Sequence, residues 1–239
     1  NQAFTPDHIC SFMSEVVGVN KNSRVLDPCC GSGAFLVRAM TDAMDDCETE
    51  EEREKVKQEQ IFGIEYEAGA FGLASTNMLI HGDGNSNVVQ DSLFNKSKWI
   101  GDNNINVVLM NPPYNATKKF CNPDYTKNWD SKKKEDPSKG FHFVEWVAKQ
   151  VSSHCKMAVL LPMQAAIGSS NDVKEFKKKM LDNYTLDAVF SLPIEIFYPG
   201  AAAVAVCMVF DLSQKHEKAN KETFFGYYRD DKFTKRKGL

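Results

Sequence analysis

The chain has 239 residues, with 29 Lys and Arg against 32 Asp and Glu, so its formal net charge is −3. Apolar residues make up 42% and charged residues 26%, which is typical of a globular protein and argues against a disordered or fibrous chain. No apolar run approaches the roughly 18–20 residues that a membrane span needs. The near-neutral charge means that nucleic acid would have to be bound through local basic patches.

Cysteine and histidine usage indicates neither a metal site nor a disulfide framework. The seven cysteines form no C-x-x-C pair, and the five histidines show no metal-ligand spacing. We therefore expect reduced thiols in a cytoplasmic protein without a metal or a membrane anchor. The chain does not begin with Met, so we expect a single domain, residues 1–239, cut from a longer protein.

The first predicted element is an amphipathic helix. Thr5 is expected to cap it and Pro6 suits its first turn, and apolar residues recur at helical spacing from Ile9 to Val17. A short strand at 24–26, a glycine-containing turn and a second helix follow.

Short β-branched runs and helical stretches alternate along the rest of the chain, which predicts a parallel sheet with crossover helices. Further strands are expected at 61–65, 88–89, 105–110, 157–161, 186–190, 203–210 and 223–227, and further helices through 73–79, 141–152 and 172–181. Residues 42–59 carry a local charge of −6 and are interpreted as a solvated helix and its loop. A short, mostly polar segment separates the last two strands and leaves no room for a crossover helix, so we expect them to pair as an antiparallel hairpin.

Residues 115–140 show no periodicity and are predicted to form a long polar loop, of the kind that is usually functional or mobile. This loop has seven lysines and four acidic residues, a local charge of +3. Together with the basic segment 229–237 it is a candidate for phosphate contact.

The first candidate ligand site follows the strand at 24–26. Asp27 ends that strand, and the turn Gly31-Ser32-Gly33 then leads into a helix, which is where open α/β sheets bind ligands. Position 36 is Leu, so the G-x-G-x-x-G pattern of a dinucleotide site is absent and a dehydrogenase is disfavoured. An Asp before the turn suits a ligand with a positive amino group. Glu65, at the end of the next strand, can accept hydrogen bonds from ribose hydroxyls.

A second candidate site is Asn111-Pro112-Pro113-Tyr114, directly after an apolar strand. The exocyclic amine of a nucleobase is a poor nucleophile, because its lone pair is delocalised into the ring. The Asn111 side-chain carbonyl and the Pro112 backbone carbonyl can accept its two hydrogens and direct the lone pair at an electrophile, while Tyr114 stacks on the base. This chemistry is positioning and electrostatic stabilisation and requires no strong base.

The order of these motifs resembles that of the gamma-class N6-adenine DNA methyltransferases, and most closely the modification subunit of type I restriction systems. The residues that carry the resemblance are Gln2-Ala3-Phe4-Thr5-Pro6, Asp27-Pro28-x-x-Gly31-Ser32-Gly33, Gly63-Ile64-Glu65, Asp91-Ser92-Leu93, Asn111-Pro112-Pro113-Tyr114 and Leu192-Pro193-x-x-x-Phe197.

The resemblance implies an α/β Rossmann-like methyltransferase fold, with a mostly parallel seven-stranded sheet and a C-terminal antiparallel hairpin. It implies S-adenosylmethionine as cofactor and the N6 amine of an adenine flipped out of double-stranded DNA as acceptor. It further implies specificity and restriction subunits as partners.

Motif matching also implies the site residues. The cofactor-binding residues would be Phe4, Thr5, Pro6, Asp27, Gly31, Ser32, Gly33, Glu65 and Asp91. The catalytic residues would be Asn111, Pro112, Pro113 and Tyr114. Tyr114 and Phe197 would pack against the two faces of the adenine, although Phe197 can equally be a core residue beside Tyr198.

Three alternatives differ in substrate or in class. Methylases of release-factor glutamine and of ribosomal RNA guanine N2 share Asn-Pro-Pro-Tyr, but they usually lack the segment Phe4–Pro6 and the ending at Phe197. A catalytically silent scaffold is disfavoured by the intact Asn111–Tyr114 and Asp27. Methylation of cytosine carbon 5 would need a Pro-Cys pair after the later strand, whereas Pro28-Cys29 lies in the first turn.

Overall fold

A computed structural model describes residues 4–82, 87–127, 129, 132–194, 196–197 and 204–229. In this part of the chain one eight-stranded sheet is formed, in the order β3-β2-β1-β4-β5-β7-β6-β8. Its strands are β1 (Val25–Asp27), β2 (Ile61–Glu65), β3 (Asn87–Gln90), β4 (Val107–Met110), β5 (Lys156–Pro162), β6 (Thr185–Ser191), β7 (Ala205–Asp211) and β8 (Phe224–Tyr227).

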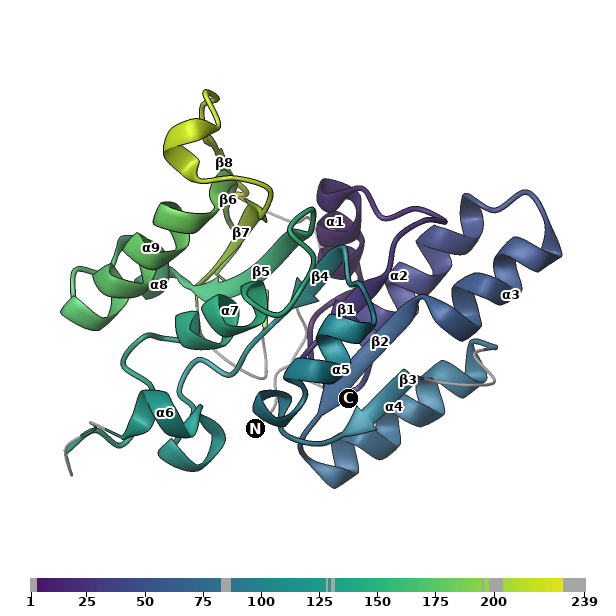
Figure 1. Cartoon of the computed structure of the whole chain (residues 1–239), viewed down its shortest axis with the longest axis horizontal. Coiled ribbons are helices and arrows are strands. Elements are labelled where there is room, and N and C mark those ends of the chain that lie inside the picture. Colours follow the sequence, from purple (N-terminus) through teal and green to yellow (C-terminus); the bar gives the residue numbers. More distant parts are fainter. Residues whose placement is uncertain are drawn as a thin grey trace.

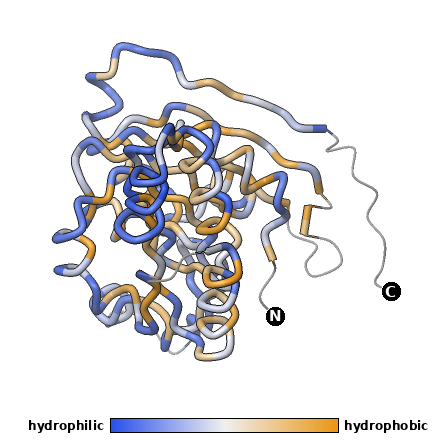
Figure 2. Tube along the Cα trace, turned by 90° about the vertical axis from the view of Figure 1, so that its right-hand side faces the viewer, coloured by the Kyte–Doolittle hydropathy of each residue, from blue (hydrophilic) through white to orange (hydrophobic). Residues whose placement is uncertain are grey.

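Helices cover both faces of this sheet (Figure 1). One face buries side chains of α1 (Asp7–Val17), α2 (Ala34–Asp45), α3 (Glu50–Glu59) and α4 (Ala68–Ile80). The other face buries side chains of α5 (Ser97–Asp102), α7 (Phe141–Ala148), α8 (Met163–Ile167) and α9 (Asn171–Asn183). Figure 2 shows hydrophobic stretches running through the middle of the trace, with hydrophilic segments at its outer turns.

The predicted architecture, a mostly parallel sheet with crossover helices and antiparallel strands near the C-terminal end, is confirmed. Strands β3, β2, β1, β4 and β5 run parallel to one another, and β7 is antiparallel to both of its neighbours, β5 and β6. The sheet has eight strands in the described chain, as the residue pattern predicts, whereas the family resemblance implies seven.

The expected pairing of the last two strands is wrong, because β8 pairs with β6, in parallel, and β7 lies between β5 and β6. The cause is the apolar character of β7, whose residues from Ala205 to Phe210 are all buried. A strand that is apolar on both faces is stable only inside the sheet. Strand β8 exposes Phe224, Phe225 and Tyr227 and takes the edge.

Helix α1 does not begin as expected, because Thr5 makes no capping hydrogen bond. Pro6 is the N-cap residue, and its carbonyl oxygen accepts from the backbone N–H groups of Ile9 and Cys10. The acidic segment does form a solvated helix, as predicted: Thr49 and Glu52 make a capping box at the start of α3.

The segment 115–140 is more ordered than the sequence suggests. It contains a 3-10 turn, η2 (Lys118–Phe120), and a short helix, α6 (Pro123–Thr126), with residues 128 and 130–131 outside the described part. Its order comes from Asp136, which is buried and whose backbone N–H donates to Ala116. The basic segment 229–237 lies outside the described residues apart from Arg229. Among the helices described, none is both long and apolar enough to cross a membrane.

Candidate active site

Three of the side chains singled out in the sequence lie at the carboxyl ends of neighbouring strands. Strands β2, β1 and β4 are parallel neighbours, so their carboxyl ends lie side by side, with about 4.8 Å between adjacent strands. Asp27 is the last residue of β1, Glu65 is the last residue of β2, and Asn111 directly follows β4. The carboxyl edge of a parallel sheet is where such folds bind ligands.

The glycine turn after β1 is held in place by β2 and α4. Gly31 and Gly33 have φ values of 54° and 84°, a left-handed conformation that favours glycine. The Gly31 N–H donates to a carboxylate oxygen of Glu65 at 2.9 Å, and the Ser32 carbonyl accepts from Asn77 of α4 at 2.8 Å. A Cβ at Gly33 would lie 3.4 Å from the backbone of α4, so a larger residue would also crowd that helix.

Asp27 and Glu65 place two carboxyl groups in the interior beside this turn. Asp27 is 1% exposed and Glu65 is 6% exposed. Burial raises the pKa of Asp27 to about 8, the Cys29 N–H that bonds to it opposes this rise, and the negative charge of Glu65 adds to it. Glu65 accepts from the backbone N–H groups of Gly31 and Glu67. Two neighbouring buried carboxyl groups favour a ligand that carries positive charge.

Asp91 lies next to Glu65 but has several partners of its own. Its backbone N–H donates to the Glu65 carbonyl at 3.0 Å, which fixes the segment after β3 beside β2. Its carboxylate accepts from Asn95 at 2.9 Å and pairs with Lys96 at 3.0 Å, and these contacts lower its pKa. An adenine amine at this carboxylate would have to share it with Asn95 and Lys96.

The Asn111 segment meets the start of α1. The Asn111 side-chain Nδ2 donates to the Thr5 hydroxyl at 3.2 Å, so the segment Phe4–Pro6 lies against the end of β4. Phe4 itself is 67% exposed. After Asn111, Pro112 is buried and Pro113 is exposed.

Tyr114 is half-buried, with its hydroxyl turned inward. The hydroxyl oxygen is buried and has no hydrogen-bond partner among the residues the structure describes. Burial raises the Tyr114 pKa, and the neighbouring Cys207 of β7 adds to the effect. A half-buried phenol can offer a ring to a base, but its hydroxyl does not face solvent.

Phe197 does not share the exposed edge. It is 5% exposed and belongs to the buried cluster that includes Ala205 and Cys207. Residues 195 and 198–203 beside it lie outside the described part of the chain. The structure thus places Phe197 in the core, and its packing against an adenine stays a prediction.

A buried polar cluster behind Pro112 was not anticipated. Asp136 accepts hydrogen bonds from the Gly140 N–H at 2.7 Å, from Ser138 and from the Tyr125 hydroxyl, and its carboxylate lies 3.1 Å from His142 Nδ1. A Cβ at Gly140 would lie 3.3 Å from the Pro112 ring, so the cluster abuts the Asn111 segment. The only sequence signal was the turn-forming stretch Asp136-Pro137-Ser138-Lys139-Gly140.

The ring of His142 also stacks on Phe94 and Tyr125. The thiols beside the glycine turn are unsuited to catalysis. Burial, followed by the charge of Asp27, raises the pKa values of Cys29 and Cys30 well above the ordinary value. Such thiols are poor nucleophiles, which argues against cytosine carbon-5 chemistry. In the described ranges, no group of three or more potential ligands could hold a metal.

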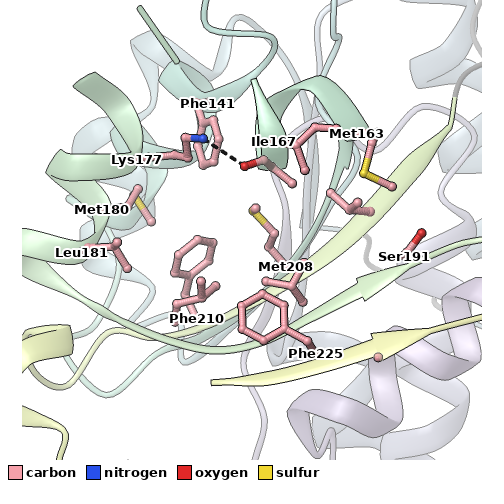
Figure 3. A pocket seen from close by; sticks show the side chains of 15 residues that line it. Phe141, Met163, Ile167, Lys177, Met180, Leu181, Ser191, Met208, Phe210 and Phe225 are labelled. Atoms are coloured by element: carbon pink, nitrogen blue, oxygen red, sulfur yellow. Dashed lines mark hydrogen bonds between the residues drawn. The ribbon is translucent and has the colours of Figure 1, made fainter. Parts of the chain in front are cut away.

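A hollow lies between α8, α9 and the sheet and is lined by none of Asp27, Glu65 and Asn111 (Figure 3). It has a volume of about 360 Å³ and is lined mainly by apolar side chains such as Met180 and Met208. Its lysine, Lys177, donates to the carbonyls of Ala166 and Gly168. This apolar lining does not suit a charged nucleoside, so the edge at Asp27, Glu65 and Asn111 is the candidate site.

Comparison with known proteins shows similarity to DNA methylases. The N-6 DNA Methylase family matches residues 1–238. The chain is 33% identical to the type II restriction enzyme and methyltransferase RM.BcgI of Heyndrickxia coagulans, over 98% of this chain and 34% of that protein. It is 26% identical to the type I restriction enzyme EcoEI methylase subunit of Escherichia coli, over 82% of this chain and 39% of that protein.

A solved structure supports the fold. A modification subunit assigned to a type I restriction enzyme of Vibrio vulnificus YJ016 superposes with a TM-score of 0.76 at 24% identity, over 98% of this chain and 49% of that chain. The chain thus spans between a third and a half of the relatives named here. With a family match over nearly all of its residues, the chain belongs to the N-6 DNA methylase family.

Proposed function

We propose that this chain is the catalytic domain that transfers a methyl group from S-adenosylmethionine to the N6 amine of adenine in DNA. The observation that carries the proposal is the position of Asn111 and Pro112, directly after β4 and beside the carboxyl ends of β1 and β2. An amine acceptor pair and a nucleoside-binding edge therefore meet at one place. The intact pair also argues against a catalytically silent scaffold.

The residues present fit S-adenosylmethionine. Asp27 and the turn at Gly31–Gly33 would hold its amino acid part, because a buried carboxyl favours the positive amino group. Glu65 would accept from the ribose hydroxyls, Asp91 would face the adenine amine, and the segment Phe4–Pro6 would close over the site. When bound, the cofactor supplies an electrophilic methyl group.

The Asn111 side-chain carbonyl and the Pro112 backbone carbonyl would accept the two hydrogens of the substrate amine. This directs the nitrogen lone pair at the methyl group. Tyr114 would stack on the base, which must leave the duplex to reach the site. Phe197 would pack on the second face of the adenine only after its ring leaves the core.

The proposed partners are double-stranded DNA and the specificity and restriction subunits of a type I system. Support comes from the relatives, because the EcoEI protein is named as a methylase subunit and one similar structure is described in the context of type I complex assembly. The basic residues of segment 115–140 would contact phosphates.

The test uses the full-length protein that contains this chain, incubated with S-adenosylmethionine labelled in the methyl group and with duplex DNA, RNA or release factor. Label should appear in DNA as N6-methyladenine. Asn111→Ala should lose roughly 100-fold or more in rate while cofactor affinity, measured by calorimetry, stays within a few-fold. Label in RNA guanine or protein glutamine, or near-normal turnover of Asn111→Ala, would overturn the proposal.

A further inference from the structure

A single hydrogen bond joins the start of the chain to the proposed catalytic amide. Asn111 Nδ2 donates to Thr5 Oγ1 at 3.2 Å, across 106 residues of sequence, in a partly buried setting. The bond takes up the nitrogen end of the carboxamide and leaves the oxygen end to other partners. Thr5 makes no helix-capping bond that would compete for its hydroxyl.

The orientation of the Asn111 amide decides whether it can act. The carbonyl oxygen and the NH₂ group of an asparagine side chain have nearly the same shape, but only the oxygen can accept from a substrate amine. In the reversed orientation, two N–H donors would face each other. An isolated asparagine would sample both orientations, so a catalytic amide needs a neighbour that anchors its side chain.

We propose that Thr5 is a positioning residue for the methyl transfer: by accepting from Nδ2, its hydroxyl keeps the Asn111 carbonyl oxygen directed at the incoming amine. This inference rests on the proposed function. It gives Thr5 a role distinct from cofactor contact, since Thr5 acts on the acceptor side of the reaction through Asn111.

The residues that follow Thr5 restrain its position. Pro6 restricts the backbone at the N-cap of α1, and the next residue, Asp7, accepts three hydrogen bonds from Arg38, the shortest at 2.7 Å. Arg38 belongs to α2, the helix that begins directly after the glycine turn. Hydrogen bonds therefore connect the proposed catalytic amide, through the start of α1, to α2, the helix that follows the proposed cofactor turn.

The experiment compares Thr5→Val, which keeps the shape but cannot accept, with Thr5→Ser, which retains the hydroxyl. Both are made in the full-length protein, with the subunits it needs for activity. A neutral hydrogen bond biases an equilibrium by roughly tenfold, so Thr5→Val should lower kcat by about 10-fold. Thr5→Ser should restore most of that loss. Cofactor Kd, measured by calorimetry, should stay within about twofold in Thr5→Val.

Thr223→Val is the matched control. The Thr223 hydroxyl also makes one hydrogen bond, to the Leu186 carbonyl at 2.9 Å, but it lies beside β8 at the far edge of the sheet. Its kcat should equal that of the wild type, which shows that loss of a threonine hydroxyl is not itself harmful.

The results separate this inference from the proposed function. If Asn111→Ala is inactive but Thr5→Val turns over within twofold of the wild type, the positioning role is wrong and the proposed function stands. If Thr5→Val weakens cofactor binding as much as it lowers turnover, Thr5 is a cofactor ligand and the inference also falls. If the wild type transfers no methyl group to adenine, the proposed function itself has failed.

Discussion

The buried carboxyl group of Asp27 lowers the stability of the folded chain at pH values where it must ionise. Its pKa is raised to about 8 by burial and by the charge of Glu65, against an ordinary value of 3.8. Between these two pH values the folded chain binds more protons than the unfolded chain. Stability therefore falls as pH rises from about 4 to about 8.

Asp27→Asn should remove this penalty, because an amide does not ionise and can still accept the Cys29 N–H. The thermal midpoint of the ligand-free variant should exceed that of the wild type at pH 8, with little difference at pH 4.5. The same variant should lose cofactor affinity in calorimetry, because a positive amino group then has no carboxylate to face. An equal midpoint difference at both pH values would show that the Asp27 pKa is not raised.

Tyr114 carries a second residue-scale cost, since its buried hydroxyl has no partner among the described residues. Tyr114→Phe should raise the free energy of unfolding by about 1 kcal/mol, measured by urea denaturation, because a desolvated hydroxyl is removed. Tyr114→Ala should instead weaken binding of a flipped adenine by roughly 1–3 kcal/mol, because a stacking surface is lost. If Phe and Ala at this position impaired methylation equally, the ring would not be the group that holds the base.

At the scale of elements, Asp136 organises the segment between β4 and α7. Burial alone would raise its pKa, but His142 and the N–H and hydroxyl donors of Gly140 and Ser138 lower it overall. This stabilisation is present above about pH 4 and is lost as pH falls through the lowered pKa of Asp136. The segment that follows the proposed catalytic residues is therefore stabilised by the charged Asp136 carboxylate.

Asp136→Asn should lower the free energy of unfolding at pH 7 by about 2–4 kcal/mol, because its NH₂ group would face the donors of Ser138 and Gly140. The difference should shrink at pH 3, and limited proteolysis should cut within 115–140 sooner. The control is Asp124→Asn in the same segment, an exposed residue whose pairing with Lys127 is worth less than about 1 kcal/mol. Equal effects of the two substitutions would mean that Asp136 is not the organising group.

Local sequence patterns predicted the elements better than their partners. The strands ending at Asp27 and Glu65 were found because apolar runs and a glycine turn are encoded within a few residues. The position of β8 in the sheet was not predicted. Strand pairing depends on how apolar each strand is compared with every other strand, and no local pattern contains that comparison. The order in 115–140 was missed for the same reason: Asp136 is buried only because residues from α6 and α7 surround it.

The candidate site shows the same limit. Motifs identified Asp27, Glu65 and Asn111, and the parallel sheet brings them to one edge. No pattern indicated the contact between Asn111 and Thr5, because it joins residues 106 positions apart. The sequence left Phe197 open between a core residue and an adenine contact, because the motif does not fix whether this aromatic ring packs inward or outward.

At the scale of the whole molecule, the residues proposed to bind the cofactor lie just before α1, at the carboxyl ends of β1 and β2, in the glycine turn and just after β3. These elements form one continuous side of the sheet. The relatives are two to three times longer than this chain, which covers 34% of one and 39% of another. The proposed cofactor site thus lies wholly within these 239 residues, whereas the longer relatives contain further chain that could serve DNA recognition.

The isolated 239-residue chain should bind S-adenosylmethionine and methylate DNA poorly. At a cofactor concentration of about 100 times Kd, binding should stabilise the chain by about 2.7 kcal/mol. Asp27→Ala should abolish the shift in thermal midpoint.

Base discrimination needs a dedicated element in a groove, and a net charge of −3 gives only weak, salt-sensitive attraction to DNA. Methylation should therefore be slow on random duplex and should rise when the full-length protein or its partner subunits are supplied. Efficient methylation at one defined sequence by the isolated chain would place recognition within these residues, with segment 115–140 the first region to mutate.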